Sequence, residues 1–295
     1  MEIRRLDIPG RDRKDAVRAW KDGFPEDSGA FIDAYFSMRA SLGESWALYD
    51  DGLCAVAHVI PQKLAFDGKT VRSACIAGVS TLSDKRYKGY ASVLMRHLHE
   101  RLRQEGLPVA FLSPFLHSFY EKLDYVTAYF TKKIVLEREN FPREDSSGLR
   151  VHHVVTRENF PLMQRAYAHY MRRFDGYVLR EASDFRWMLK DAELDGAGVQ
   201  LIEDTQGYSG YAVFTYSAEE KTLEIVEWCA PQHLFDALLT ALMPQDCRRV
   251  IYRVPVHRDE PDAEPGQMLL ALEESAGALM APPERMRIMH MFEKY

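Results

Sequence analysis

A short basic stretch, "RYKGYA" over residues 86–91, has residue types that suit the binding of phosphate groups. It lies between an apolar run and a long amphipathic segment. Where a helix begins, unpaired backbone N–H groups and the positive end of the helix dipole attract anions. Gly89 would let the backbone approach a phosphate closely, and Arg86 and Lys88 add positive charge. The stretch therefore predicts a pyrophosphate site, although a basic surface loop capping a helix would carry similar residues.

The segment after this stretch predicts the helix that the phosphate site requires. Leu94, Leu98 and Leu102 recur every four residues, with charged and polar residues largely on the other face. Gly106 is well placed to end the helix. We therefore expect a helix over about residues 90–105.

The segments on either side predict a mixed sheet. Two helices are expected over 12–22 and 27–41, then three or four antiparallel strands before residue 83, because the turns "DDG" and "FDGK" pair Asp with Gly. After the long helix, "PVAFLSPF" reads as a buried strand, "HSFYEKL" as a short helix and "YVTAYFTKKIVLE" as a long strand that closes the first half.

A polar stretch at 138–148 then interrupts the pattern, and the order of elements starts again. Helices, antiparallel strands, a helix and a strand follow one another as in the first half, without detectable sequence identity. We therefore predict an α/β protein with mixed sheets and two domains, residues 1–140 and 149–295, joined by a linker at 141–148.

The basic stretch and its context resemble a known family. The pattern R/Q-x-x-G-x-G/A after a strand and before a helix is similar to the acetyl-CoA site of the GNAT acetyltransferases, with Ala91 in the small final position. "GVSTLSDKRYKGYASVLM" and "LPVAFLSPFLHSFYEKLDYV" resemble the Eis-like (enhanced intracellular survival) branch. The resemblance is strongest over about residues 50–136. It implies tandem GNAT-like domains and N-acetylation of aminoglycosides, polyamines or lysines.

Two departures from this branch stand in the sequence. Its members usually carry a third, sterol-carrier-like domain, which we do not expect in this chain. Asp124 also stands where the family has Gly in "K-L-G-F/Y". Asp tolerates the left-handed conformation better than most residues, so we expect this turn to be kept.

The resemblance implies a role for each residue of the site. Tyr120 matches the tyrosine that acts as general acid toward the leaving thiolate. The backbone of the strand before the basic stretch would pair with the pantetheine amides, and the residues after the next strand would mark where the thioester lies. The residues implied in acetyl-CoA binding are Val79, Ser80, Thr81, Arg86, Tyr87, Lys88, Gly89, Tyr90, Ala91, Ser92, Phe115 and Leu116.

The general base and the acceptor side are less defined. In the family a C-terminal carboxylate presented by the third domain is thought to act as the base. The carboxylate of Tyr295, Glu26, Asp27, His117 and a chain of water molecules are the alternatives here. Glu26 and Asp27 would also suit helix capping. The acidic residues of the N-terminal segment around Glu26 and Asp27 lead us to expect a small cationic amine as acceptor.

The second half lacks the cofactor pattern. Its helix "PQHLFDALLTALM" begins without glycine or basic residues. We therefore expect a catalytically degenerate GNAT-like domain that walls the substrate side, and one acetyl-CoA per chain.

Composition excludes several classes of protein. The net charge of −6 argues against a nucleic-acid binder, and the four cysteines have neither CxxC spacing nor a nearby His cluster, so no metal is expected. The N-terminus lacks the apolar segment of a signal peptide, and no apolar run reaches about 20 residues. We expect a cytoplasmic protein with no membrane or nucleic-acid partner, and leave open whether it is a homo-oligomer.

Two other functions fit parts of the sequence. A non-catalytic acyl-CoA-binding sensor or partner-binding protein would keep the cofactor pattern but not need Tyr120. An aminoacyl transferase with tandem GNAT domains would use charged tRNA, which the acidic balance disfavours.

Overall fold

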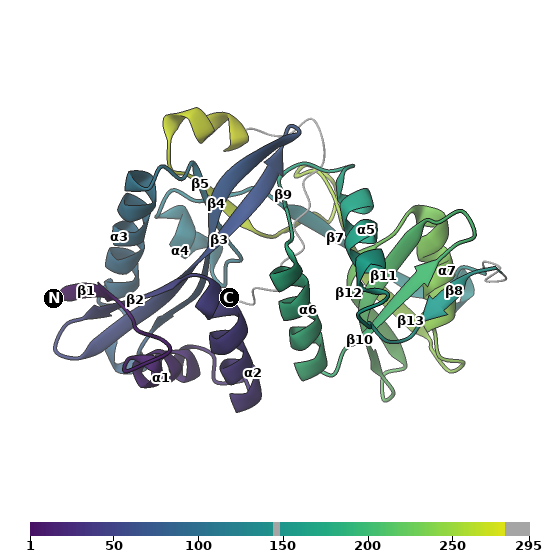
Figure 1. Cartoon of the computed structure of the whole chain (residues 1–295), viewed down its shortest axis with the longest axis horizontal. Helices are drawn as coiled ribbons and strands as arrows, with labels where there is room; N and C mark the ends of the chain where they lie inside the picture. Colours follow the sequence, from purple (N-terminus) through teal and green to yellow (C-terminus); the bar gives the residue numbers. More distant parts are fainter. Residues whose placement is uncertain (144–147, 281–295) are drawn as a thin grey trace.

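The computed structural model describes residues 1–143 and 148–280, which form two units side by side, each built on one sheet (Figure 1). The protein is therefore of the mixed α/β class, as the sequence predicts.

The first sheet contains eight strands among the described residues. Seven of them follow the order β1-β2-β3-β4-β5-β15-β6, and β9 pairs with the edge of β3. Their bounds are β1 Glu2–Arg5, β2 Glu44–Tyr49, β3 Leu53–Phe66, β4 Lys69–Thr81, β5 Val109–Leu112, β6 Val126–Thr127, β9 Tyr177–Val178 and β15 Met268–Ala271.

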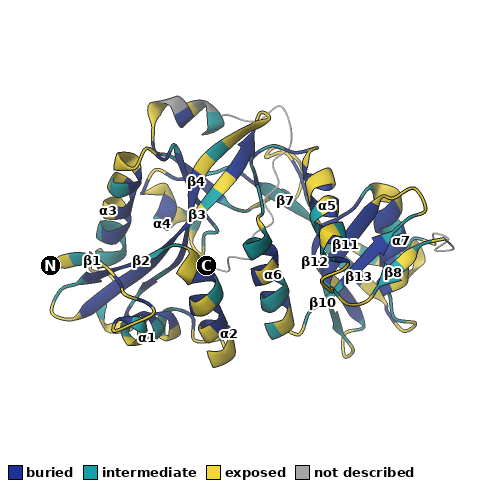
Figure 2. Cartoon of the chain, viewed as in Figure 1, coloured by how far each residue is buried: buried dark blue, intermediate teal, exposed yellow. Residues whose placement is uncertain are grey.

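Helices cover both faces of this sheet. On one face α3 packs its apolar side, including Leu94, Leu98 and Leu102, and on the other lie α1 and α2. Figure 2 shows the sheet buried along its centre, while helix surfaces and hairpin ends are exposed. The helices span α1 Arg13–Gly23, α2 Gly29–Ala34, α3 Tyr90–Gln104 and α4 His117–Glu121. The helix expected over 27–41 continues beyond α2 as a π-helical turn, Tyr35–Arg39, and a 3-10 turn, Ala40–Leu42.

The second sheet repeats the plan with seven strands in the described part of the chain. Its order is β14-β7-β13-β12-β11-β10-β8. The bounds of its strands and helices are β7 Phe130–Glu137, β8 Arg150–His152, β10 Gly198–Glu203, β11 Ser209–Ser217, β12 Thr222–Cys229, β13 Arg249–Pro255, β14 Glu264–Pro265, α5 Phe160–Met171, α6 Ala182–Leu194 and α7 Gln232–Leu242.

The two halves exchange one strand each. β7 leaves the first half and lies between β13 and β14 of the second sheet, whereas β15 returns from the second half and lies between β5 and β6 of the first. Read from β1 and from β8, the two sheets then have the same order of strands. The exchanged strands occupy corresponding places.

The strand exchange corrects the prediction of one long closing strand. The stretch 125–137 is not one closing strand, because β6 ends at Thr127 and β7 begins at Phe130 in the other sheet. Tyr129, between them, is buried and donates its hydroxyl hydrogen to the Gly176 carbonyl at 2.6 Å. The two sheets also do not divide at residues 141–148, and part of this predicted linker, 144–147, lies outside the described residues.

Side chains from both units meet at the seam between the sheets. Asp184 of α6 accepts from Arg39 at 2.7 Å and from Gln62 at 2.9 Å. The ring centroid of Trp187, also on α6, lies 5.7 Å from that of Phe31 and 5.6 Å from that of Tyr35 in the first unit. The two units are therefore joined by packing as well as by exchanged strands.

We predict that the protein unfolds in a single cooperative transition. Unfolding of either sheet would remove the partners of the strand that the other half contributes to it, β7 or β15. We therefore expect the two sheets to unfold together. In differential scanning calorimetry the calorimetric and van't Hoff enthalpies should agree. Two transitions that separate on changing pH or denaturant would contradict this expectation.

Candidate functional site

The central feature of the first sheet is the point where β4 and β5 part. Their parallel pairing runs from Ser73 and Val109 to Cys75 and Phe111 and then stops. β4 continues to Thr81, so its edge facing β5 has no strand partner beyond Cys75 in the described structure. Pro114 follows β5, where it cannot donate to a ladder. A gap results beside this edge of β4, with no strand paired there among the described residues.

A bulge in β4 lies beside this gap. The register with β3 shifts between Val56 and His58, and Gly78 has a φ of +58°. A Cβ at Gly78 would lie 2.5 Å from the Trp20 ring and 2.7 Å from that of His58. Only glycine therefore fits, and sequence analysis missed this packing because Trp20 and His58 come from distant segments.

The start of α3 has the geometry expected for an anion site. Gly89 is the N-cap with φ +80°, and apart from its chain neighbours no atom of the described residues lies within 4 Å of where its Cβ would be. Tyr87 is also left-handed, with φ +64°, and its side chain is fully exposed. The first N–H groups of α3 are thus presented to open space, which suits a pyrophosphate. We call residues 86–92 the phosphate cradle.

Two basic side chains brace the loop. Lys85 donates to the carbonyl oxygens of Asp50 at 3.3 Å and Asp51 at 3.0 Å. Arg86 donates to the carbonyl oxygens of Thr81 at 3.3 Å and Asp22 at 3.1 Å. These bonds fix the loop, so Arg86 helps to position the cradle as well as charging it.

The hairpin between β2 and β3 supports the cradle as well. Tyr90, the first residue of α3, donates its hydroxyl hydrogen to an Asp50 carboxylate oxygen at 2.8 Å. This bond to the carboxylate raises the pKa of Tyr90 to about 12 and lowers the pKa of Asp50. The sequence predicted only a turn at "DDG". It did not indicate that Asp50 of this turn also supports the start of α3.

The other predicted cofactor residues lie along the same path. Val79 and Thr81 are half-buried and Ser80 is buried on β4, and Ala91 and Ser92 follow in the first turn of α3. Lys88 is exposed and makes no hydrogen bond or ion pair with a described residue. Beyond β5, Phe115 is 85% exposed and Leu116 55% exposed, which is unusual for such large apolar groups and leaves them available to a ligand.

Tyr120 lies on α4 with its ring buried against Phe119 and Tyr125 at centroid distances of 4.9 and 5.8 Å. No described residue forms a hydrogen bond with its hydroxyl group. Burial raises the pKa of Tyr120 to about 12, so the phenol keeps its proton at neutral pH. The turn after α4 is kept as expected, because Asp124 adopts a left-handed φ of +67°.

The candidates for the acceptor side have different surroundings. Glu26 is exposed, whereas Asp27 accepts the indole hydrogen of Trp20 at 2.7 Å. The Nε2 of His117 donates to the Gly266 carbonyl oxygen at 3.0 Å, which ties α4 to the segment before β15. Tyr295 lies outside the described residues.

The corresponding gap of the second sheet is closed. β12 and β13 pair only from Thr222 and Arg249 to Glu224 and Ile251. Beyond that point the buried Trp228 donates its indole hydrogen to the Arg253 carbonyl at 3.1 Å and stacks on Phe235. Pro231 precedes α7 and cannot donate an N–H. Trp228 therefore bridges β12 and β13 where the two strands part.

Two buried histidines predict that the protein loses stability in acid. Burial lowers the pKa of His58 to about 3, and burial followed by the charges of Arg103 and Arg96 lowers the pKa of His99 to about 4. The unfolded chain binds protons below pH ~6.5 and the folded chain does not. The free energy of unfolding should therefore fall from about pH 6.5 down to about pH 4, by up to about 1.4 kcal/mol per pH unit for each histidine.

Urea unfolding at several pH values measures this slope. His99→Asn should reduce it, whereas the same change at the exposed His97 should leave it intact. An unchanged slope in the first variant would show that other groups cause the loss.

Metal and membrane sites are not indicated. Within residues 1–143 and 148–280 no group of three or more His, Cys, Asp or Glu side chains is arranged to hold a metal ion. In the same part of the chain no helix is both long and apolar enough to cross a membrane.

Comparison with known proteins relates this geometry to a fold family. Residues 2–128 match the family model described as "Acetyltransferase (GNAT) domain". No curated protein matches. Both sheets and the strand order agree with the GNAT fold, and a tandem GNAT protein from the clavulanic acid biosynthesis pathway superposes with a TM-score of 0.56 at 11% identity, covering 92% of this chain and 98% of that one.

Two other solved structures are more similar. A probable N-acyltransferase from Enterococcus faecalis superposes with a TM-score of 0.79 at 19% identity. The alignment covers 92% of this chain and 72% of the Enterococcus chain. Eis1 from Mycobacterium abscessus has a TM-score of 0.72 at 16% identity, with coverage of 94% and 75%. At these identities the likeness establishes the fold alone.

Proposed function

We propose that this chain, whose first unit contains a GNAT acetyltransferase domain, transfers an acetyl group from acetyl-CoA to a primary amine. The observation that carries the proposal is the edge of β4, which has no strand partner beyond Cys75 in the described structure, followed after a 3-10 turn, Ser83–Lys85, by the left-handed Gly89 at the start of α3. Pantetheine amides can pair with that edge, and the pyrophosphate can accept from the first N–H groups of α3. The second unit, with Trp228 across its gap, would bind no cofactor.

The chemistry asks for one proton donor and one proton acceptor. Acetyl-CoA supplies an acyl group activated as a thioester. As the amine nitrogen forms its bond to the acyl carbon and the carbon–sulfur bond breaks, the Tyr120 hydroxyl donates a proton to the departing sulfur. Its raised pKa keeps that proton in place until negative charge develops on the sulfur.

The proton lost by the attacking amine goes to a group on the acceptor side. Glu26 and Asp27 lie between α1 and α2, and we propose them, with the C-terminal carboxylate of Tyr295, as the carboxylates of this side. Hydrogen bonding of His117 Nε2 to Gly266 leaves only its Nδ1 able to accept a proton.

The acidic character of this side is weaker than the sequence suggests. Asp22 accepts from the Ser83 backbone N–H, and Asp33 pairs with Arg13 at 2.8 Å. Asp27 holds Trp20, so only Glu26 of the four has no interaction with a described residue. We propose a small cationic amine as acceptor, of the aminoglycoside, polyamine or lysine class, bound with modest affinity.

Release of CoA thiol in the presence of a panel of amines tests the function. Aminoglycosides, polyamines and lysine peptides should give higher kcat/KM than neutral arylamines, and the difference should shrink at high salt because screening weakens attraction between charges. A higher kcat/KM for a neutral arylamine at every salt concentration would contradict the proposal of a cationic acceptor. Binding of acetyl-CoA with no release for any amine would favour the sensor and overturn the transferase.

A further inference from the structure

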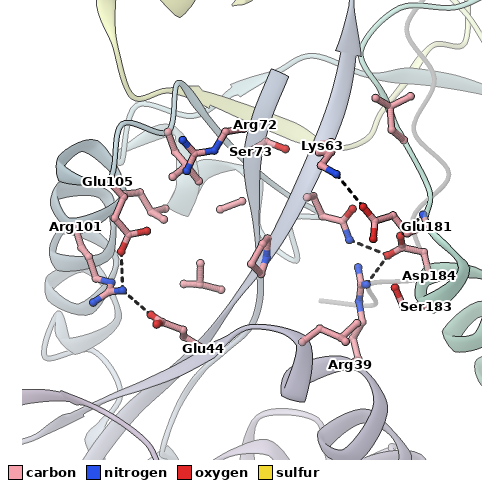
Figure 3. Close-up of a pocket in the computed structure, with 18 residues that line it drawn as sticks. Arg39, Glu44, Lys63, Arg72, Ser73, Arg101, Glu105, Glu181, Ser183 and Asp184 are labelled. Atoms are coloured by element: carbon pink, nitrogen blue, oxygen red, sulfur yellow. Dashed lines mark hydrogen bonds and ion pairs between the residues drawn. The ribbon is translucent and has the colours of Figure 1, made fainter. Parts of the chain in front are cut away.

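A pocket of about 470 Å³ opens at the seam between the two units, away from the cofactor cradle. Its walls come from the C-terminal end of α3, from the β3–β4 ribbon and from the segment that leads into α6 (Figure 3). The volume lies within the range of small-molecule sites.

The acidic residues of this pocket are already neutralised by neighbours. Arg101 contacts Glu44 at 2.8 Å and Glu105 at 2.6 Å on one side. On the other side Lys63 contacts Glu181 at 2.9 Å, and Arg39 contacts Asp184 at 2.7 Å. Figure 3 shows these pairs on opposite walls. A cationic ligand would have to displace a bound lysine or arginine.

One cation of the pocket is uncompensated. Arg72 stands between the two walls in Figure 3 and makes no hydrogen bond or ion pair with a described residue. The adjacent Ser73 also lines the pocket, and its buried hydroxyl has no hydrogen-bond partner within the described structure. A guanidinium of this kind binds a carboxylate through two parallel hydrogen bonds. The charge without a partner in this pocket, among the described residues, is therefore positive, which suits an anion.

Most of the remaining lining is apolar, apart from Gln62 and Ser183. Val59, Pro61 and Ala74 come from the ribbon, Leu102 and Leu107 from the end of α3, and Leu179 from the segment between β9 and α6. We propose that this pocket binds a small amphipathic carboxylate, with the carboxylate on Arg72 and the apolar body on this surface. Because the ligand would bind the folded chain and not the unfolded one, its binding should also raise the melting temperature.

This site is separate from the proposed acyl-transfer site. None of its lining residues belongs to the cradle or to α4. Along β4, Ser73 and the Gly78 bulge are five residues apart, or about 16 Å at the usual strand rise. A ligand here should bind together with acetyl-CoA, and the proposal does not depend on the enzymatic reaction.

Calorimetric titration of the full chain with 4-phenylbutyrate tests the proposal, with 4-phenylbutanamide as the uncharged probe of the same shape. The carboxylate should bind at least about tenfold more tightly than the amide, since a hydrogen-bonded charge pair contributes about that much. Arg72→Gln should remove this preference. The matched control is Arg248→Gln, which makes the same change at an exposed arginine of the second unit.

Four results would overturn the site: no binding of the carboxylate, equal binding of acid and amide, an unchanged affinity in Arg72→Gln, or displacement by saturating acetyl-CoA. Retained affinity in Arg248→Gln and a raised melting temperature only with the carboxylate would support it.

Discussion

Replacing Tyr120 by phenylalanine should lower kcat by about 10²- to 10⁴-fold, the usual contribution of a general acid. The ring packs against Phe119 and Tyr125 and would keep those contacts, while the hydroxyl makes no hydrogen bond with a described residue that its loss would break. Stability and the Kd for acetyl-CoA should therefore change little. Single-turnover measurements are the right readout, because slow product release would hide a change in the chemical step.

Tyr125→Phe is the matched control. It removes a hydroxyl from the neighbouring ring, which bonds to His99 Nε2 at 3.1 Å. This variant should lose stability and keep its turnover. Were Tyr120→Phe as fast as the parent in a single turnover, Tyr120 would be a core aromatic and another group would protonate the sulfur.

Replacing Gly89 by glutamate should abolish acetyl-CoA binding while the fold persists. Nothing lies within 4 Å of the Cβ position, so the new side chain would extend into the space where a pyrophosphate is expected, with a charge that repels it. The positive φ of +80° adds strain of about 1–2 kcal/mol for a residue other than glycine. Calorimetry should give one acetyl-CoA per chain for the parent and none for the variant.

Gly106→Glu is the control that separates damage to the phosphate cradle from the general effects of backbone strain and of an added negative charge. Gly106 lies just beyond the other end of α3, also has a positive φ, +65°, and also faces open space. Its glutamate variant should lose similar stability and bind acetyl-CoA as the parent does. Equal cofactor affinity in both variants would place the phosphate site elsewhere, and a stoichiometry of two would mean that the second unit is not degenerate.

The sequence by itself determined most of the local structure of the first unit. Residues 90–104 form α3, near the expected span, because leucine at every fourth position gives one apolar face and Gly106 ends the helix in the left-handed region. The hairpin turns at Asp51–Gly52 and Asp67–Gly68 follow from residues that tolerate positive φ. The open start of α3 at Gly89 was equally local, since a few neighbouring residues set it.

What the sequence could not determine was which segments meet. Residues 130–137 and 268–271 are strands in the structure, and alternation of side chains says which face is buried but not which sheet supplies the neighbour. The strand 268–271 was not predicted at all, and the first half was expected to close its own sheet. Only the tertiary structure revealed the exchange of strands.

The same limit applies to the site. Gly78 must be glycine because Trp20 and His58 lie against it, and the cradle is held by Asp22 and Asp50 from other elements. Trp228 closes the gap in the second sheet by reaching the carbonyl of Arg253 on the next strand. Each of these contacts joins residues far apart in the chain. The local sequence determines the left-handed backbone at the start of α3. Contacts between residues far apart in the chain determine whether the gap between β4 and β5, or that between β12 and β13, stays open.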